Sequence, residues 1–227
     1  MNDRRGLLVW GASGHGKVVL ECARAMSSFE PVSFIDDAYT IEGEFFGTPV
    51  LGTRACLAPA LVRQYPNMVI AIGDNLSRAE CFSVAVTWGF RLVTVIHPSA
   101  VVSCSALLGP GSVVIAGAII NANSTIGSNC IINTGATVGH DCSVGDHVHI
   151  APHVALAGET RIGDYAHIGI GAVAVQQTVV GEHAVVGAGA VLVENVPPHV
   201  TVVGVPAHIV RQQARTVFDA LSEVGSE

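Results

Sequence analysis

A stretch in the second half of the chain that repeats every six residues decides the fold. From Thr125 it reads TIGSNC (125–130), IINTGA (131–136), TVGHDC (137–142), SVGDHV (143–148), HIAPHV (149–154) and ALAGET (155–160). The second position of each hexad is Ile, Val or Leu, and the sixth is small or β-branched. An apolar position with a period of six does not match an α-helix, whose apolar face recurs every 3.6 residues.

The same phase continues without a break from Val102 to Leu192. Of the sixteen positions spaced by six in this span, fifteen are branched aliphatics, and the exception is Ala174. Short strands separated by turns explain the pattern, and the Gly or Asn that often follows the aliphatic would adopt positive φ. Three hexads would close one triangular coil around a ladder of aliphatic side chains. Because the six-residue spacing of the aliphatic positions is never interrupted, it favours this solenoid over a low-complexity stretch or an ordinary β-sandwich.

The composition excludes several classes of protein. The 227 residues are 50% hydrophobic but only 13% charged, about half the charge of a typical soluble domain. No run of about 18 uninterrupted apolar residues occurs, so we expect no membrane span. With a net charge of −7, and Arg161 as the only Lys or Arg between Ala100 and Val210, the chain lacks the basic patch that nucleic acid requires. The apolar run after Arg5 is too short for a secretory signal, so we expect a cytoplasmic protein.

The six cysteines are scattered and include no C-x-x-C pair. In a chain of this length they are typical of reduced thiols used as small apolar residues. We therefore expect neither a disulfide nor a structural zinc site.

Before Ala100 the pattern changes to alternating strands and helices. This order predicts a Rossmann-like α/β domain with a small parallel sheet, whose binding edge lies at the carboxyl ends of the strands. The predicted strands are Leu7–Trp10, Val32–Ile35, Met68–Ile72 and Leu92–Ile96, and the predicted helices are Lys17–Met26, Leu57–Tyr65 and Leu76–Trp88.

A glycine turn, GASGHG (11–16), follows the first strand. Its spacing is G-x-x-G-x-G rather than the dinucleotide pattern G-x-G-x-x-G, but backbone N–H groups at the start of a helix can still bind a phosphate. Asp36 and Asp37 follow about 20 residues later, a spacing that suits a ribose or a base edge. A purely structural junction between strand and helix remains an alternative for this turn.

The domain organisation that follows has three parts. Residues 1–97 would form the Rossmann-like domain and residues 98–208 the β-helix. Residues 209–227 would form a C-terminal tail with a short helix from Ile209 to Leu221 that closes the base of the coils.

The order of motifs is more specific than any one of them. The glycine turn is followed by Asp36-Asp37, then AIGDN (71–75), IHPSA (96–100), the hexads, and Gly204-Val205-Pro206-Ala207. From about Leu7 to Ala207 the chain resembles the hexapeptide-repeat acetyltransferases that N-acetylate nucleotide-linked amino sugars, and their close relatives that O-acetylate sialic acid. The resemblance implies a left-handed parallel β-helix and a homotrimer with acetyl-CoA bound between neighbouring β-helices. The expected acceptor is a 4-amino-4,6-dideoxy sugar on UDP, dTDP or GDP.

The resemblance also implies catalytic residues. Acetyl transfer from a thioester to an amine needs a base for the proton and donors for the oxyanion. The segment NTGATVGHDC (133–142) matches the family pattern Asn-Thr-x-x-x-x-x-His-acid-Cys. It makes His140 the base, Asp141 its orienting carboxylate and Asn133 a group that faces the same cleft. An exposed turn histidine without a catalytic role is the alternative for His140.

Binding residues carry over in the same way. Substrate would be bound by the glycine turn, by the paired aspartates and by residues after the third strand, and the cofactor by residues along the coils. For the CoA phosphates, Arg161 and Arg211 are the only arginines near enough in sequence. The substrate set is Gly14, His15, Asp36, Asp37, Gly73 and Asn75, and the cofactor set is His149, Gly158, Ile170, Ala188 and Arg211.

Three other functions remain as alternatives. The paired Asp36-Asp37 favours a nucleotide, and hence N-acetylation, over O-acetylation of sialic acid. A non-catalytic module that binds nucleotide sugars would not need Asn133, His140 and Asp141 together. A zinc site of the carbonic anhydrase type, which shares this fold, uses two histidines five residues apart, and the gaps here are 7, 2, 4, 14 and 16 between His140 and His183. We therefore expect no metal.

Overall fold

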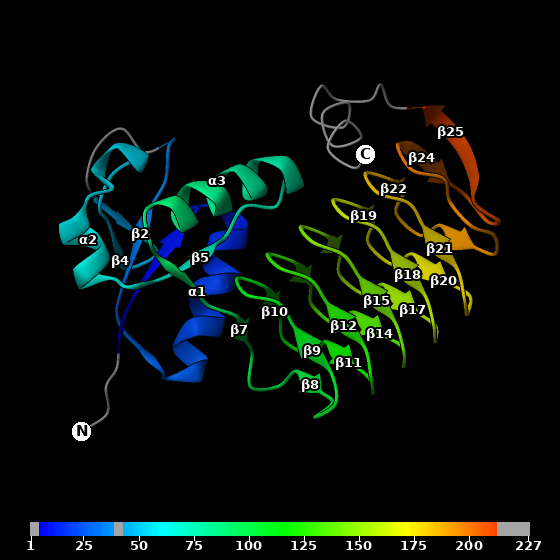
Figure 1. Ribbon diagram of the computed structural model, residues 1–227, viewed down its shortest axis with the longest axis horizontal. Helices are drawn as coiled ribbons and strands as arrows, with labels where there is room; N and C mark the ends of the chain where they lie inside the picture. Colours follow the sequence, from blue (N-terminus) through cyan, green and yellow to red (C-terminus); the bar gives the residue numbers. More distant parts are fainter. Residues whose placement is uncertain (1–4, 39–42, 213–227) are drawn as a thin grey trace, which may run out of the picture.

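The computed structural model describes residues 5–38 and 43–212. An α/β domain lies beside the first coils of a left-handed parallel β-helix, and the stack of coils runs away from it toward β24 (Val200–Val203) and β25 (His208–Gln212) (Figure 1). The fold class predicted from the sequence is confirmed.

The α/β domain is built on a six-stranded sheet in the order β3-β4-β2-β1-β5-β6. The predicted strands and helices are present, with ends that shift by a few residues. The hairpin β3–β4 was not predicted from the sequence, and its antiparallel pairing makes the sheet mixed rather than purely parallel. The elements are β1 (Arg5–Trp10), α1 (Gly14–Met26), β2 (Phe29–Ile35), β3 (Gly43–Phe45), β4 (Thr48–Val50), the 3₁₀ turn η1 (Arg54–Cys56), α2 (Pro59–Gln64), β5 (Asn67–Ile70), α3 (Asn75–Thr87) and β6 (Arg91–Leu92).

The predicted strand Leu92–Ile96 is two strands in the structure. β6 completes the sheet of the α/β domain, whereas β7 (Val95–Ile96) pairs with β10 in the first coil. The chain changes sheet at Val93 and Thr94, because Val93 N donates to Met68 O and Val95 N donates to Ser112 O. The β-helix therefore begins slightly before the predicted boundary at residues 97 and 98.

Each coil contributes one strand to each of three parallel sheets. We call these the β16 face (β7, β10, β13, β16, β19, β22 and β24, with β25 at its edge), the β14 face (β8, β11, β14, β17, β20 and β23) and the β15 face (β9, β12, β15, β18 and β21). Paired residues are 18 apart in sequence, as between Val138 and Leu156. The strands are β8 (Val101–Val102), β9 (Leu107–Leu108), β10 (Val113–Val114), β11 (Ile119–Ile120), β12 (Thr125–Ile126), β13 (Ile131–Ile132), β14 (Thr137–Val138), β15 (Ser143–Val144), β16 (His149–Ile150), β17 (Ala155–Leu156), β18 (Arg161–Ile162), β19 (His167–Ile168), β20 (Val173–Ala174), β21 (Val179–Val180), β22 (Val185–Val186), β23 (Val191–Leu192), β24 (Val200–Val203) and β25 (His208–Gln212).

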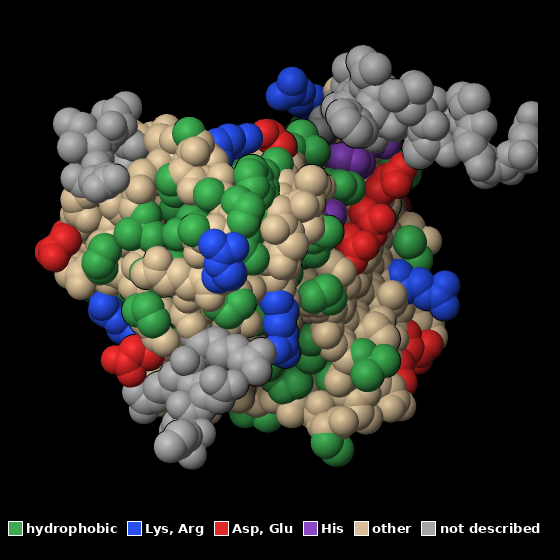
Figure 2. Space-filling view, turned by 60° about the vertical axis from the view of Figure 1, so that its left-hand side comes forward, with side chains coloured by type: hydrophobic (Ala, Val, Ile, Leu, Met, Phe, Trp, Pro, Cys, Tyr) green, Lys and Arg blue, Asp and Glu red, His purple; other side chains and the backbone are tan. Residues whose placement is uncertain are grey.

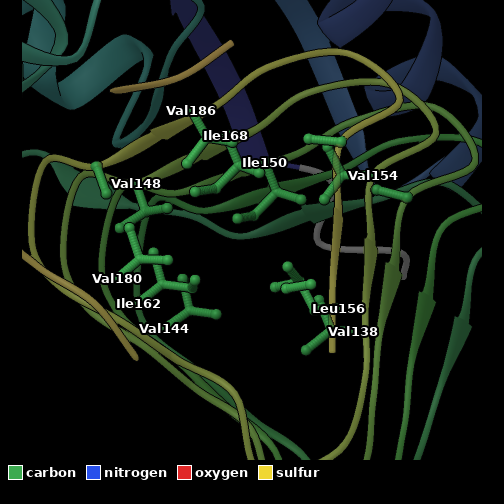
Figure 3. Packing of buried hydrophobic residues seen from close by; sticks show 14 of the residues in the cluster. Val138, Val144, Val148, Ile150, Val154, Leu156, Ile162, Ile168, Val180 and Val186 are labelled. Carbon is green, nitrogen blue, oxygen red and sulfur yellow. The ribbon is translucent and has the colours of Figure 1, made fainter. Parts of the chain in front are cut away.

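The aliphatic ladder fills the interior as predicted. Figure 3 shows Ile150, Val144 and Val138 pointing inward from the three faces. From Val114 to Leu192 every position of the ladder is at most 5% exposed. Burying one Val, Leu or Ile contributes about 1.5–3 kcal/mol, so the regular hexads account for the stability of a domain with few aromatic residues.

The predicted positive φ of the glycines that often follow the aliphatic residue is wrong. These residues, such as Gly139 and Gly169, do not adopt positive φ. They are small because the next coil is close: a Cβ on Gly139 would lie 2.7 Å from Ala157 C, and one on Gly169 would lie 2.6 Å from Val186 O. The residues with positive φ come two positions later, at the corners, as at Gly135, Asp141 and His147.

The prism has three corners, and each takes its name from one of its residues. The Asn133 corner joins the β16 face to the β14 face, the His140 corner joins the β14 face to the β15 face, and the His147 corner joins the β15 face to the β16 face. A given corner recurs every 18 residues, so Gly158 lies one coil beyond His140.

The predicted C-terminal helix is wrong over the residues that the structure describes, up to Gln212. Residues His208–Gln212 form β25, which pairs antiparallel with β24. After the last coil, β24 offers a free edge of backbone N–H and C=O groups, and β25 satisfies these more directly than a helix would. The rest of the predicted helix, residues 213–221, lies outside the described residues.

The α/β domain covers the first part of the β16 face. The outward side chains of Val95, Val113 and Ile131 are at most 1% exposed, and Val95 and Val113 belong to one core cluster with α1 and β1. Within the described ranges, no helix is both long and apolar enough to cross a membrane. Because the two parts share a core, the carboxyl edge of the small sheet has a fixed position against β16.

Candidate active site

His140 and Asp141 form a hydrogen-bonded pair on the surface of the His140 corner. His140 Nδ1 lies 2.7 Å from Asp141 Oδ2, and the two side chains are 64% and 50% exposed. A carboxylate only accepts hydrogen bonds, so Nδ1 carries the proton and Nε2 of the neutral ring is an acceptor. The His140 hydrogen bond, helped by Asn123 Nδ2 at 3.3 Å from Asp141 Oδ1, lowers the pKa of Asp141 below its ordinary value.

The ring of His140 lies against Gly158 in the next coil. A Cβ on Gly158 would come within 2.5 Å of His140 Nε2 and 2.6 Å of Cε1. Glycine at this position therefore leaves room for the ring, and the side chain as a whole is 64% exposed. The pair has the geometry of a general base with an orienting carboxylate.

A second group of polar side chains lies on the β16 face near the Asn133 corner. His149 Nδ1 is 3.3 Å from Gly73 O, and His149 Nε2 is 3.2 Å from Asn133 Nδ2. A carbonyl accepts, so His149 carries its proton on Nδ1 and accepts from Asn133 at Nε2. Asn133 Oδ1 in turn accepts from Thr134 N at 2.8 Å. These contacts fix both side chains and link the α/β domain to the coils.

Three neighbouring histidines are held neutral. The ring centroids of His15 and His149 are 6.5 Å apart, and those of His149 and His167 are 4.9 Å apart at 85°, an edge-on contact. Burial first, and then the neighbouring charges, lower the pKa of His149 to about 3. Burial and then Arg78 lower the pKa of His15 to about 4, and burial also lowers that of His167. His15 Nε2 is buried with no hydrogen-bond partner.

The glycine turn begins α1 as predicted, and Gly14 is exposed at its first residue. Asp36, at the end of β2, accepts from Ala12 N at 2.6 Å and from Ala38 N at 2.7 Å. One role of Asp36 is thus to hold the turn. Asp37 lies further out and pairs with Arg54 at 2.7 Å.

Arg54 was missed by the sequence analysis. It joins Asp37 to Glu80, whose carboxylate is 2.6 Å from Arg54 Nη1, and its guanidinium lies over the Trp10 ring at 5.4 Å from the centroid. Nothing in the local sequence marks this residue, because the three partners come from separate elements.

Asn75 lies where predicted, after β5, but it is buried and its side chain is fully engaged. Asn75 Nδ2 donates to Tyr165 O at 2.8 Å and to Ala166 O at 3.1 Å, and Oδ1 accepts from Arg78. Arg78 was also missed. A charged residue within the buried stripe of α3, with Asn75, Cys81 and Ala85, is the signal that could have found it.

The remaining predicted cofactor residues lie on the surface of the coils. Ile170 and Ala188 are exposed one coil apart at the Asn133 corner. Arg161 is exposed on the β15 face, and Arg211 is exposed on β25 at the far end of the stack.

One chain does not bring the predicted catalytic residues together. Asn133 precedes β14 and His140 follows it, so they lie at the two ends of the β14 face. The α/β domain lies on the β16 face, which joins the Asn133 corner and lies opposite the His140 corner.

The His147 corner has a different character. Figure 2 shows acidic side chains in a row along the coils, with histidine side chains beside them. The rings of His147, Tyr165 and His183 stack in succession at 4.9 Å and 4.7 Å. This regular column of rings ties successive coils together.

Comparison with known proteins agrees with this architecture. Residues 6–85 match the family described as PglD N-terminal domain, and residues 123–158 match bacterial transferase hexapeptide (six repeats). The acetyltransferase domain of PglB from Neisseria gonorrhoeae FA1090 is 43% identical over 91% of this chain and 100% of that chain, with a TM-score of 0.86. The chain belongs to the hexapeptide-repeat sugar acetyltransferases.

Two further members of these sugar acetyltransferases are similar. PerB from Caulobacter crescentus, solved with CoA and GDP-perosamine, is 43% identical over 91% of this chain and 97% of that chain, with a TM-score of 0.86. UDP-N-acetylbacillosamine N-acetyltransferase from Bacillus subtilis (strain 168) is 37% identical over 114 residues. That match covers 48% of this chain and 50% of the relative, so the chain spans about half the length of the curated relative it matches.

Proposed function

We propose that this protein transfers the acetyl group of acetyl-CoA to the 4-amino group of a nucleotide-linked 4-amino-4,6-dideoxy sugar, in the cytoplasm as the sequence predicts. The observation that carries the proposal is the exposed His140, oriented by Asp141 at 2.7 Å and seated against Gly158. It supports an acetyl transfer because the chain is 43% identical, over nearly its whole length, to PerB, whose structure contains CoA and GDP-perosamine.

The proposed mechanism is direct transfer without a covalent enzyme intermediate. The neutral sugar amine attacks the thioester carbonyl, a C–N bond forms, and His140 Nε2 takes a proton from the nitrogen. When the tetrahedral intermediate collapses, the C–S bond breaks and the thiolate of CoA leaves, to be protonated from His140 or from solvent. Asp141 stabilises the imidazolium that forms on the way. A backbone N–H is the proposed donor to the oxyanion.

The active site is proposed to be completed in a homotrimer. The outward residues of the β14 face carry no charge: they are Val101, Ile119, Thr137, Ala155, Val173 and Val191. Such a face is suited to pack against other copies. With the β14 faces turned toward a three-fold axis, the Asn133 corner of one copy lies beside the His140 corner of the next.

This arrangement would bring together Asn133 and His140, which lie at opposite ends of the β14 face within one chain. The sugar held by the α/β domain of one copy, near His15 and Asn133, would meet His140 of the neighbouring copy. The groove between the two corners would be lined by Gly158 on one side and by Ile170 and Ala188 on the other. Small or apolar residues suit the pantetheine arm of acetyl-CoA, while Arg211 and Arg161 remain proposals for its phosphates.

The nucleotide is proposed to bind at the carboxyl edge of the small sheet. The first turn of α1 offers backbone N–H groups to a diphosphate at Gly14 and His15. Asp36 and Asp37 follow β2 at the same edge, where carboxylates can accept from a base. Because Asp37 is already paired with Arg54, the base would meet this ion pair rather than a free carboxylate.

A panel of acceptors tests the proposal. Release of CoA thiol from acetyl-CoA is measured with UDP-, dTDP- and GDP-linked 4-amino-4,6-dideoxy sugars and with sialic acid, and with H140A as the blank. We expect turnover with one or more of the nucleotide sugars and an N-acetylated product by mass spectrometry. Turnover with sialic acid alone would replace the proposal with O-acetylation. Binding of a nucleotide sugar with no turnover would favour a non-catalytic module.

A further inference from the structure

Arg78 joins the two domains through a set of hydrogen bonds to backbone oxygens. The residue is 1% exposed. Nε donates to Asn129 O at 2.9 Å, Nη1 donates to Ile72 O and Gly73 O at 3.1 Å each, and Nη2 donates to His147 O at 2.7 Å. The guanidinium thus holds the turn after β5 against the His147 corner of two successive coils.

The neighbouring Asn75 extends the same contact to a third coil. Its Oδ1 accepts from Arg78 Nη2 at 2.7 Å while its Nδ2 donates to Tyr165 O and Ala166 O. The first turn of α3 therefore contacts the coils at positions 129, 147 and 165, which are 18 residues apart. A buried charge is costly, and a rigid fork of five donors is suited to fixing one arrangement of several acceptors.

One of the carbonyls that Arg78 holds is the one that contacts His149. Gly73 O accepts from Arg78 Nη1 and lies 3.3 Å from His149 Nδ1. His149 Nε2 then accepts from Asn133 Nδ2 at 3.2 Å. A continuous series of contacts runs from the buried guanidinium to Asn133 on the surface of the Asn133 corner.

We propose that Arg78 is a positioning residue: it fixes the Ile72–Gly73 turn so that Gly73 O holds His149 in the tautomer whose Nε2 orients Asn133. Arg78 itself reaches neither substrate nor the reacting atoms in this arrangement. Its effect on the reaction rests on the proposed function, whereas its effect on His149 does not.

The charges around His149 act in the same direction. Groups that face it are His15 on α1, His167 on β19 and Arg78 on α3. After burial and His167, Arg78 is the next cause that lowers the pKa of His149 to about 3. A neutral His149 can accept from Asn133, and a protonated one cannot.

The test measures by NMR which nitrogen of the His149 ring carries the proton. R78K keeps the positive charge but loses the planar fork, so a change in His149 reports geometry rather than charge. In protein labelled with ¹⁵N-histidine, the ring signals of His149 are assigned by their loss in H149Q. Wild type is expected to show one tautomer, protonated at Nδ1. R78K is expected to show a substantial share of the Nε2-protonated form.

R24K is the matched control. Arg24 donates to Thr48 Oγ1 at 2.7 Å elsewhere in the same domain, and R24K is expected to leave the His149 signals as in wild type. Wild-type signals for His149 in R78K would overturn the proposal, and so would an equal change in R24K. If R78K does not fold, N75A removes a partner of Nη2 and keeps Arg78, and unchanged His149 signals in that variant would overturn the proposal as well.

Measurements of kcat/KM distinguish a positioning role of Arg78 from a role in stability alone. At a temperature where R78K is folded, kcat/KM is expected to fall by up to about 10²-fold, as for other misplacements of reacting groups, and R24K should keep the wild-type value. Altered His149 signals with wild-type kcat/KM would overturn the link to the reaction. If wild type acetylates no acceptor, the proposed function fails, and the His149 signals still decide whether Arg78 positions the ring.

Discussion

Gly158 lies against the ring of His140, so close that a Cβ on Gly158 would come within 2.5 Å of His140 Nε2. Nε2 is the atom proposed to take the proton, because Nδ1 is held by Asp141. The next coil therefore limits where the His140 ring can lie, and the 18-residue period that builds the fold also positions the proposed base.

G158A should lower kcat while the protein stays folded. The added methyl meets the end of a side chain, which can move, rather than backbone, so the free energy of unfolding should change little while the His140 ring is displaced. We expect kcat for thiol release to fall by about 10-fold or more, approaching the roughly 10²-fold loss expected for H140A. G43A is the control, since a Cβ there meets nothing within 4 Å. Wild-type kcat in G158A would contradict the assignment of Nε2.

D141N should also lower kcat, because it removes the charge that stabilises the imidazolium and leaves the shape of the side chain unchanged. D141E keeps the charge and is expected to recover part of the activity. Both variants should melt near the wild-type temperature, since Asp141 is exposed. Equal kcat for D141N and wild type would mean that Asp141 has no part in the reaction.

V173D should break the trimer and abolish turnover. Val173 is 37% exposed on the uncharged β14 face, and a carboxylate there would be buried without a partner in the proposed interface. V179D is a matched control, because Val179 is similarly exposed (39%) but lies on β21, in the β15 face. Sedimentation should show a smaller species for V173D only. A trimer that survives V173D, or dissociates equally in V179D, would rule out the β14 face as the interface.

The stability of the protein should fall as the pH falls from about 6.5 to about 4. Burial lowers the pKa of His149 to about 3 and that of His15 to about 4, from 6.5. In this range the unfolded chain binds protons that the folded protein does not, so stability rises with pH. Each histidine accounts for about 2 kcal/mol between pH 7 and pH 5. Urea midpoints at pH 7 and pH 5 measure the effect.

H149Q is expected to reduce this pH dependence. A pH dependence of the urea midpoint that is the same in H149Q and in wild type would show that His149 titrates alike in the folded and unfolded protein.

G169A should destabilise the coils. A Cβ on Gly169 would lie 2.6 Å from Val186 O and 2.8 Å from Ala188 N, which are backbone atoms of the next coil. Such overpacking costs about 1–3 kcal/mol, and the melting temperature should fall by several degrees. G43A should melt as wild type does. An unchanged melting temperature in G169A would mean that neighbouring coils can separate at no cost.

Much of this protein could be predicted from the sequence because its determinants are local and repeated. A period of six with single aliphatics predicts three-sided coils, and the strand–turn–helix order before Ala100 predicts the α/β domain. Where the prediction failed, the cause was non-local: several residues after the aliphatics, such as Gly139 and Gly169, are glycine because of the coil 18 residues away, and β25 forms a strand because β24 has a free edge.

The candidate site divides in the same way. The sequence by itself determined the His140–Asp141 pair and the glycine turn, since each is a contiguous motif whose residues meet through one stretch of backbone. Only the tertiary structure decided that Asn133 and His140 lie at opposite ends of the β14 face, that Asp37 pairs with Arg54, and that Arg78 reaches Gly73 and the coils together. Those relationships join elements distant in sequence, and the packing of the α/β domain on the β16 face sets them.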